Sequence, residues 1–529
     1  MSQAEIVIVG GGHNGLVCAC YLAANGHSVR VLERRYIVGG AAVTEEFHPG
    51  FRNSTASYTV SLLHPKVIKD CRLVERGLKI IERPYSNFLP LDNGEHIKIG
   101  GGLVATQAEV ARFSARDALA LLRYYAMLET VADVLRGTLL VTPPNSGGGL
   151  GDFIASIKLL KRFKALNLAA RRDVLDLFTK SAGEVLDSYF ESVPIKAAFG
   201  FDAVVGNFAS PYTPGSAYVL LHHVFGEVNG KKGIWGHAVG GMGAITQALA
   251  AEAMARGVQI QTDAEVAEVL VENGAACGVR LASGEVLRAT RVVSNLNPKL
   301  LFGKLVSGQH LDADFSQRIS NYQCGSGTFR MNVALDALPN FSCMPHSNFE
   351  GASHHQSGII MAPSMAYMER AFFDAKLNGY STKPIVEILI PSTVDNTLAP
   401  AGKHVASLFC QHFNPKLKAG QSWDNLRQTA ADIIIDTVNS YAPNFKQSII
   451  ASQIHSPLDL ERKFGLVDGD IFHGRLSLDQ LFSARPILGY GNYGTPIKGL
   501  YQCGSGTHPG GGVTGVPGHN AAREVLRGM

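Results

Sequence analysis

The chain has 529 residues, with 48 Lys and Arg against 44 Asp and Glu, and its formal net charge is +4. A charge so nearly balanced argues against nucleic acid as the main partner. No apolar run approaches the roughly 20 residues that cross a bilayer, and the first residues lack the pattern of a secretory leader. We therefore expect a cytoplasmic enzyme of two or three domains with substantial cores.

The first thirty-three residues predict a dinucleotide-binding unit. Ile6–Val9 predicts a buried strand, residues 14–25 a helix and residues 28–32 a second strand. The loop between the first strand and the helix has the pattern G-x-G-x-x-G, in which glycines allow a tight turn, close approach to a pyrophosphate and close packing of the helix. The helix N-terminus then faces the phosphates. The three glycines of this pattern are Gly10, Gly12 and Gly15.

Glu33 ends the second predicted strand, where a carboxylate accepts hydrogen bonds from ribose hydroxyls and disfavours a 2′-phosphate. FAD or NAD therefore fits better than NADP. The following run includes Gly39-Gly40-Ala41 and resembles the flavin-contacting segment of flavin-dependent desaturases and amine oxidases. Many amine oxidases have an arginine after the glycine pair, and this chain has Ala41. The resemblance implies FAD as the cofactor.

The middle of the chain predicts a helix over residues 115–136 and strands over 385–390 and 405–411. Residues 152–190 alternate basic and apolar side chains. Such helices bind membrane surfaces, but they are also common on the surfaces of soluble proteins. We favour an ordinary solvated face here; peripheral membrane contact and contact within a homo-oligomer are the alternatives.

The loop Gly240-Gly241-Met242-Gly243 precedes an apolar run but lacks the third glycine of a dinucleotide fingerprint, and residues 237–239 do not predict a convincing strand. We read it as the return of the chain into the FAD domain rather than as an NADPH site. Strands are predicted after it over residues 258–262, 264–271, 276–281 and 286–293, with turns at Asn273-Gly274 and Ser283-Gly284.

The C-terminus predicts a strand at residues 500–503, a glycine-rich loop and a helix over 516–526. The loop Gly506-Thr507-His508-Pro509-Gly510-Gly511-Gly512-Val513 resembles the C-terminal signature of phytoene desaturases. The resemblance implies that the Val513 amide faces the N1/C2 end of the flavin, where a helix N-terminus suits the negative charge of reduction. Many relatives have an acid where this chain has Ser505.

Motifs along nearly the whole chain resemble the family of pyridine nucleotide-disulfide oxidoreductase domain-containing protein 2. They include Glu33-Arg34-Arg35, Thr213-Pro214-Gly215-Ser216 and Asp459-Leu460-Glu461-Arg462. The resemblance implies an FAD oxidoreductase without a settled substrate, with mitochondrial relatives in animals. With its superfamily, the resemblance implies cofactor contacts at Gly10, Gly12, Gly15, Glu33, Arg34, Gly40, Ala41, Val266, Gly504, Ser505, Gly512 and Val513.

The family name suggests disulfide chemistry, which the cysteines do not support. None of the eight forms a C-x-x-C or C-x-x-x-x-C pair, and no metal-ligand spacing is present. Cys18 and Cys20 are two apart on a predicted helix, so they do not face each other. We interpret all eight as scattered core thiols.

Catalytic side chains are not identified by the sequence. Hydride transfer onto flavin N5 requires positioning of a C–H bond and no obligatory acid or base. His222, His223 and His508 are weak candidates. The first two follow residues 218–221, a predicted helix or strand over the flavin, and His508 is in the flavin loop, with a structural or flavin-tuning role more expected than catalysis.

We therefore predict an α/β protein with a Rossmann-type FAD-binding domain interleaved with a mixed α+β substrate domain. The FAD domain takes residues 1–75, 238–308 and 485–529, and the substrate domain takes 76–237 and 309–484. The predicted activity is desaturase-like hydride transfer from an unidentified small molecule to FAD, and a lipophilic substrate is one option. The alternatives are an amine oxidase, and a flavoprotein that mainly binds a partner or a membrane.

Overall fold

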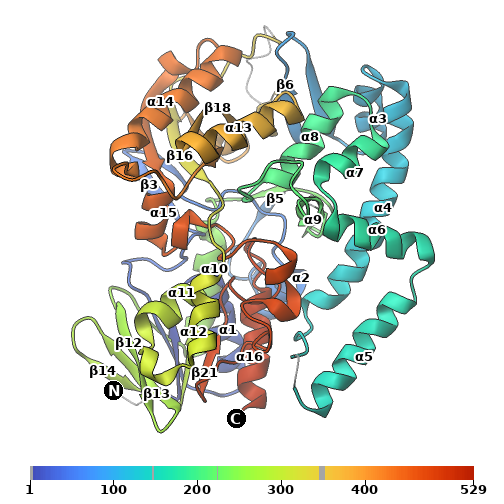
Figure 1. Cartoon of the computed structure of the whole chain (residues 1–529). Helices are drawn as coiled ribbons and strands as arrows, with labels where there is room; N and C mark the ends of the chain where they lie inside the picture. The colour runs from blue at the N-terminus through green and yellow to red at the C-terminus, as the bar shows by residue number, and fades with distance from the viewer. Residues whose placement is uncertain (1–3, 146–147, 223, 345–351) are drawn as a thin grey trace.

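The computed structural model describes residues 4–145, 148–222, 224–344 and 352–529. A five-stranded parallel sheet lies at the bottom of Figure 1, beside both chain ends, with strand order β11-β2-β1-β15-β21. Its strands come from three separate parts of the chain. They are β1 Ile6–Val9, β2 Val29–Leu32, β11 Gln259–Gln261, β15 Arg291–Ser294 and β21 Leu500–Gln502.

Both faces of the parallel sheet are covered, which explains why its central strand β1 is apolar throughout. Ile6 and Ile8 of β1 pack with helices α1 His13–Ala24, α10 Gly243–Ala255 and α16 Val516–Arg527. Val7 and Val9 point to the other face and pack against a small antiparallel sheet, as the alternation of side chains along a strand requires. That sheet consists of β12 Val266–Glu272, β13 Ala275–Leu281 and β14 Val286–Arg288.

A seven-stranded mixed sheet lies at the top of Figure 1, with order β20-β16-β19-β18-β17-β6-β7. Only β17 and β6 in it run parallel. Helix α14 Trp423–Tyr441 packs on one face, and α8 Val193–Val204 and α13 Met365–Asn378 belong to the core on the other. The strands are β6 Tyr85–Pro90, β7 His96–Gly100, β16 Phe329–Leu335, β17 Gly358–Met361, β18 Tyr380–Leu389, β19 His404–Phe413 and β20 Ile449–His455.

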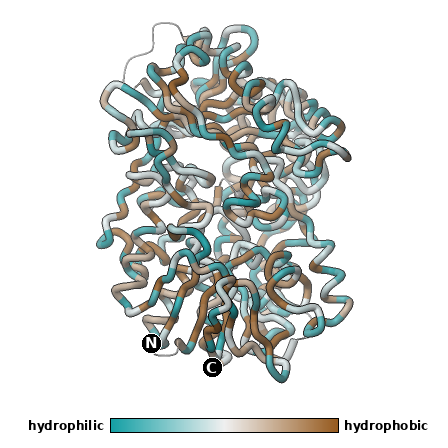
Figure 2. The backbone as a smooth tube through the Cα atoms, turned by 90° about the vertical axis from the view of Figure 1, so that its left-hand side faces the viewer, coloured by the Kyte–Doolittle hydropathy of each residue, from teal (hydrophilic) through white to brown (hydrophobic). Residues whose placement is uncertain are grey.

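A helical layer stands beside this sheet, at the right of Figure 1. Its helices are α3 Leu103–Ala111, α4 Ala115–Leu139, α5 Leu150–Lys164, α6 Leu168–Thr179, α7 Ala182–Tyr189 and α9 Ala217–His222. Hydrophobic segments run through the interior of both sheets, as the brown tube of Figure 2 shows.

Shorter elements complete the described chain. They are β3 Thr44–His48, β4 Phe51–Ser54, α2 Pro65–Asp70, β5 Ile80–Glu82, β8 Glu227–Val228, β9 Lys231–Lys232, β10 Gly236–Ala238, α11 Pro298–Leu300, the π-helix Leu301–Leu305, α12 Ala313–Asn321, α15 Pro457–Phe464 and the 3₁₀ turns Gly308–His310, Pro391–Thr393, Lys446–Ser448, Val467–Gly469, Leu478–Gln480 and Phe482–Ala484.

The predicted fold class is confirmed, including the interleaving of the two domains; the exact domain boundaries stay predictions.

The single strand expected over residues 286–293 is wrong, because β14 pairs with β13 whereas β15 joins the parallel sheet. The apolar alternation continues across that corner, so it could not reveal the change of sheet. Residues 236–238 form a short strand after all, but β10 pairs antiparallel with β5, outside the parallel sheet. No helix of the described residues is long and apolar enough to span a bilayer.

Candidate functional site

The glycine loop between β1 and α1 has the geometry that a dinucleotide requires. Gly10 has φ +96°, a conformation that favours glycine, and a Cβ at Gly15 would lie 2.3 Å from the Gly10 carbonyl oxygen. Helix α1 begins without a side-chain cap, so its first N–H groups face outward from the loop. Gly39 donates its N–H to the Gly11 carbonyl at 2.9 Å, which brings the second glycine pair, including Gly40, against the first loop.

Glu33 lies beside this loop and is 6% exposed. Its carboxylate accepts N–H groups from Gly11 and Arg35, each at 2.9 Å, and keeps further lone pairs for a ligand. Val266, expected near adenine, lies at the start of β12 and packs with Leu32. Arg34 turns away: it is exposed and donates to the Arg462 carbonyl at 2.8 Å.

The C-terminal tail returns to the same loop. Asn14 donates to the Ser505 hydroxyl at 3.2 Å, and a Cβ at Gly504 would lie 2.6 Å from the Asn295 carbonyl oxygen. Val513 has φ +57°, which is strained for a β-branched residue. Strain of this kind concentrates where a backbone is held for function. It falls on the residue whose amide was expected at the flavin.

A cavity of about 550 Å³ begins at these two loops, with Ala41, Gly512 and Val513 in its wall. It continues into the substrate domain between the helical layer and the seven-stranded sheet. Its volume is typical of sites for small molecules. The apolar and aromatic part of the lining includes Leu62, Ile99, Tyr124, Tyr125, Leu128, Phe199, Phe201, Val205, Leu220, Trp235, Phe409, Leu466, Ile471 and Phe472.

The residues at the loop end fit a bound dinucleotide because several buried polar atoms there have no partner among the described residues. They are His13 Nε2, Asn14 Oδ1 and His473 Nδ1. Burial, with a smaller effect of His473, lowers the pKa of His13 to about 3, and burial lowers that of His473 to about 4. Both rings are therefore neutral at pH 7 and able to donate or accept a hydrogen bond.

Of the three weak histidine candidates, only His508 has a described side chain, and that side chain lies outside the cavity wall. His508 Nε2 lies 3.1 Å from the Thr138 carbonyl, its ring packs on Phe482, and it does not line the cavity. Burial lowers the pKa of His508 to about 4, so a neutral ring fixes the tail to α4. His223 lies outside the described residues, and only the backbone of His222, at the end of α9, is described.

A second polar group in the cavity was not found by sequence reasoning. Glu387 of β18 accepts the Tyr58 hydroxyl at 2.5 Å. Arg330 of β16 lies with its Cζ 4.5 Å from the centre of the Tyr58 ring. Arg83, between β5 and β6, lines the cavity with Tyr58 and Glu387. Asp202 of α8 lines it too, and burial raises its pKa to about 8. These residues are far apart in sequence, so no local pattern connects them.

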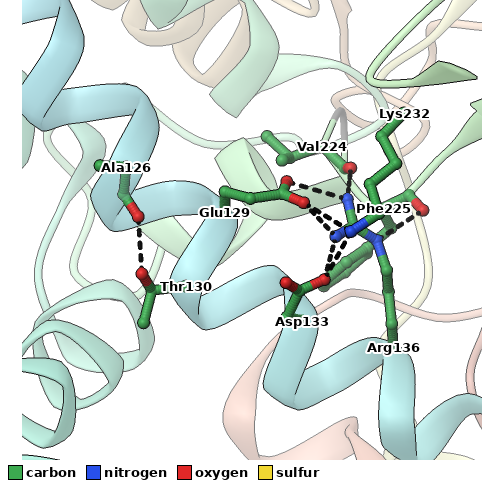
Figure 3. Close-up of polar contacts among 8 residues, drawn as sticks. All are labelled: Ala126, Glu129, Thr130, Asp133, Arg136, Val224, Phe225 and Lys232. Carbon is green, nitrogen blue, oxygen red and sulfur yellow. Dashed lines mark hydrogen bonds and ion pairs between the residues drawn. The ribbon is translucent and has the colours of Figure 1, made fainter.

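A cluster of ion pairs joins two segments of the cavity wall (Figure 3). Lys232, in β9, reaches Glu129 of α4 at 2.9 Å and Asp133 at 3.0 Å. Arg136 pairs with the same two carboxylates and donates to the carbonyls of Val224 and Phe225. The cluster fastens the segment after α9 to α4. The side chains of the cluster are partly exposed, so each ion pair contributes little to the stability of the fold.

All eight cysteines are free thiols, and they are less scattered than expected. Cys18 lies against Cys503, and Cys20 against Cys71. A hydrogen bond between the thiols of each pair, together with burial, raises the pKa of Cys18 and of Cys20 well above the usual range. Protonated, buried thiols are poor nucleophiles, and no cysteine lines the cavity.

Comparison with known proteins agrees with this geometry. Residues 15–328 match the family model of flavin containing amine oxidoreductase. The chain is 41% identical to pyridine nucleotide-disulfide oxidoreductase domain-containing protein 2 of Mus musculus, over 99% of this chain and 94% of that one. It is 26% identical to a neurosporene-forming phytoene desaturase of Cereibacter sphaeroides, over 97% of this chain and 92% of that one.

Among solved structures, a triple mutant of putrescine oxidase superposes with a TM-score of 0.63 at 16% identity, covering 99% of this chain and 98% of that one. At this identity the likeness concerns the fold alone. The family match and the full-length identity to the mouse protein carry the assignment. The chain belongs to the flavin containing amine oxidoreductase family and, within it, to the family of pyridine nucleotide-disulfide oxidoreductase domain-containing protein 2.

Proposed function

We propose that this FAD-dependent oxidoreductase oxidises a largely apolar small molecule held in the cavity. The observation that carries the proposal is the continuity of one cavity from the Gly512-Val513 backbone to the aromatic wall around Tyr124 and Phe199. FAD, when bound, supplies the acceptor for a hydride from the substrate. The residues of the chain orient the reacting C–H bond and exclude water. The name of the related phytoene desaturase points to the same class of substrate.

An amine oxidase is the weaker alternative. The cavity carboxylates Glu129 and Glu387 already have partners in Lys232 and Tyr58, whereas the guanidinium of Arg83 repels an amine cation. A flavoprotein with only a binding role is the other alternative. The test is anaerobic mixing of the FAD-loaded protein with fractionated cell lipids and polar metabolites. Bleaching of the flavin absorbance by a lipid fraction supports the proposal. Bleaching only by amines favours an amine oxidase, and no bleaching by any fraction favours the binding role.

NADPH is expected to reduce the flavin slowly or not at all. The N-terminal N–H groups of α10 are already occupied, because Met242 donates to the Ser54 hydroxyl and Gly243 to the Thr44 hydroxyl, each at 2.9 Å. A Cβ at Gly241 would lie 2.4 Å from Thr44 Oγ1, so these glycines serve close packing against β3. Stopped-flow mixing under nitrogen measures the rate. Bleaching by NADPH within the first seconds would contradict this expectation.

We also propose that α5 touches an anionic lipid surface. Figure 1 shows α5 standing away from the rest of the molecule, and none of its residues is buried. Leu150, Phe153, Ile154, Ile157 and Leu160 follow the spacing of one helical face, and the exposed fraction of Phe153 is 63%. An exposed apolar stripe is unusual for a solvated face, and basic residues flank it, as in interfacial helices. They are Lys158, Lys161, Arg162 and Lys164.

The protein is expected to sediment with vesicles that contain phosphatidylglycerol but not with pure phosphatidylcholine. Replacing Phe153 by glutamate removes the burial of one phenylalanine, about 1.5–3 kcal/mol, and should lower the vesicle affinity at least about tenfold. The matched control is Val104→Glu, because Val104 is 80% exposed and belongs to a different helix, α3. Equal affinity of F153E and the native protein, or equal sedimentation with both lipids, would exclude this contact.

A further inference from the structure

We propose that the cavity selects a substrate with an apolar body and a carboxylate, and that Arg83 pairs with this carboxylate. The inference rests on the proposed function and names its class of substrate. Arg83 lies between β5 and β6, and its backbone N–H is fixed by the Trp235 carbonyl at 3.0 Å. Its Nη2 donates to the Thr59 hydroxyl at 2.5 Å, and the side chain lines the cavity. A guanidinium has five N–H donors, so most of them remain for a ligand.

Arg83 has no carboxylate partner of its own. Within the described residues, no Asp or Glu oxygen lies within 4.0 Å of its guanidinium, and the Glu387 carboxylate acts on it only from beyond that distance. Burial lowers the pKa of Arg83, which reflects the cost of holding this cation away from water. Buried charges in proteins are normally paired. A cation left unpaired in a cavity wall therefore indicates an anionic ligand.

The neighbouring carboxylate does not fill this role. Glu387 accepts the hydroxyl of Tyr58, and the charges of both Arg83 and Arg330 act on it. Arg330 is 1% exposed and donates to the Ser407 hydroxyl at 2.6 Å. Asp202 adds little negative charge at pH 7, because burial raises its pKa to about 8. Two guanidinium groups, of Arg83 and Arg330, therefore face the one carboxylate of Glu387, and the cluster keeps an excess of positive charge. An anion relieves this excess, whereas an amine cation adds to it.

The rest of the cavity wall defines the body of the ligand. Ser86 and Asn87 stand near Arg83 in the chain and also line the cavity, whereas Leu128, Phe199 and Phe201 offer hydrocarbon surface. A carboxylate binds a guanidinium through two parallel hydrogen bonds, which also fixes its direction. A ligand held at Arg83 by its head is therefore oriented along the cavity, and its chain extends over the apolar wall. Arg83 would act as a specificity-determining residue.

The test compares three probes of equal chain length, decanoate, decanol and decylamine, by calorimetric titration of the FAD-loaded protein. Decanoate is expected to bind at least about tenfold more tightly than either of the others, because only its head pairs with the cation. Arg83→Gln should abolish this preference by lowering the affinity for decanoate to that for decanol. Arg83→Lys, which keeps the charge, should retain part of it. Arg116→Gln is the matched control, because Arg116 is exposed on α4 and pairs with Glu191 at 2.7 Å.

The inference is overturned if decylamine or decanol binds as tightly as decanoate, if none of the three probes binds, or if R83Q keeps the preference for decanoate. Circular dichroism of R83Q and R83K monitors folding, and R83K keeps the test decisive if R83Q does not fold. The outcome is separate from that for the proposed function. If the protein prefers decanoate but no metabolite reduces its flavin, the binding site is supported and the proposed oxidoreductase function is contradicted. If a metabolite reduces the flavin but the protein does not prefer decanoate, the oxidoreductase function is supported and the carboxylate site is contradicted.

Discussion

Replacing Asp395 by alanine is expected to lower the free energy of unfolding by about 3–5 kcal/mol, because several buried donors lose their acceptor at about 1–3 kcal/mol each. Asp395 is 3% exposed and lies 2.8 Å from His237 Nε2. It also accepts the N–H of Gly240 at 2.7 Å and both the N–H and the hydroxyl of Thr397. The carboxylate thus holds the segment at which the chain returns to the parallel sheet. Urea unfolding followed by circular dichroism measures the loss.

Asp436→Ala is the matched control, because Asp436 pairs with Lys446 at 2.7 Å on the surface, where an ion pair contributes at most about 1 kcal/mol. A loss for D395A no larger than that for D436A would show that the buried carboxylate is not needed for stability.

The effect of Asp395 depends on pH in a defined direction. Burial alone would raise its pKa, but the hydrogen bonds from His237, Thr397 and Gly240 outweigh burial and hold the pKa well below the usual range. A carboxyl group with a depressed pKa stabilises the folded state above its unfolded pKa, about 3.9, and the stabilisation disappears as the pH falls through the folded pKa. The difference between D395A and the native protein should therefore stay constant between about pH 8 and pH 5 and shrink below about pH 4.

The sequence predicted the parts of this molecule that depend on neighbouring residues. The turn at Gly10, the helix after it and Glu33 lie within one short unit, and each has a local signal. The C-terminal loop was predicted in the same way. Asn14 and Ser505 form the contact between the N-terminal and C-terminal loops. The sequence predicts this contact only through the inference that both loops bind the same ligand.

The polar group around Arg83 could not be predicted in this way. Arg83, Arg330 and Glu387 lie on three separate segments, and the pairing of β16, β18 and β19 brings the last two together. The sequence around each of these three residues contains no pattern that distinguishes it from an ordinary charged residue. Their burial and the absence of a carboxylate partner for Arg83 among the described residues are properties of the folded chain. For the same reason the sequence named histidines as candidates, whereas His508 is bonded to the Thr138 carbonyl outside the cavity.

Replacing Gly512 by valine is expected to release the flavin or to lower its reduction potential, without loss of the fold. Gly512 lines the cavity and has φ +103°, and Val513 after it is already strained at φ +57°. A side chain at Gly512 adds about 1–3 kcal/mol of strain and displaces the Val513 amide, which we propose stabilises negative charge on the flavin. Loss of about 1 kcal/mol of that stabilisation would lower a two-electron potential by about 20 mV. A dye-coupled flavin titration measures the shift.

Gly402→Val separates this effect from strain as such. Gly402 also has a positive φ, +72°, but lies in an exposed turn with open space around it. The two variants therefore carry a similar backbone strain, and only G512V carries it into the cavity wall. A G402V protein with the native potential, beside a G512V protein with a lower one, assigns the shift to the tail. If G512V binds FAD normally and keeps its potential, the C-terminal loop does not contact the flavin, and the strain at Val513 serves only the packing of α16 behind it.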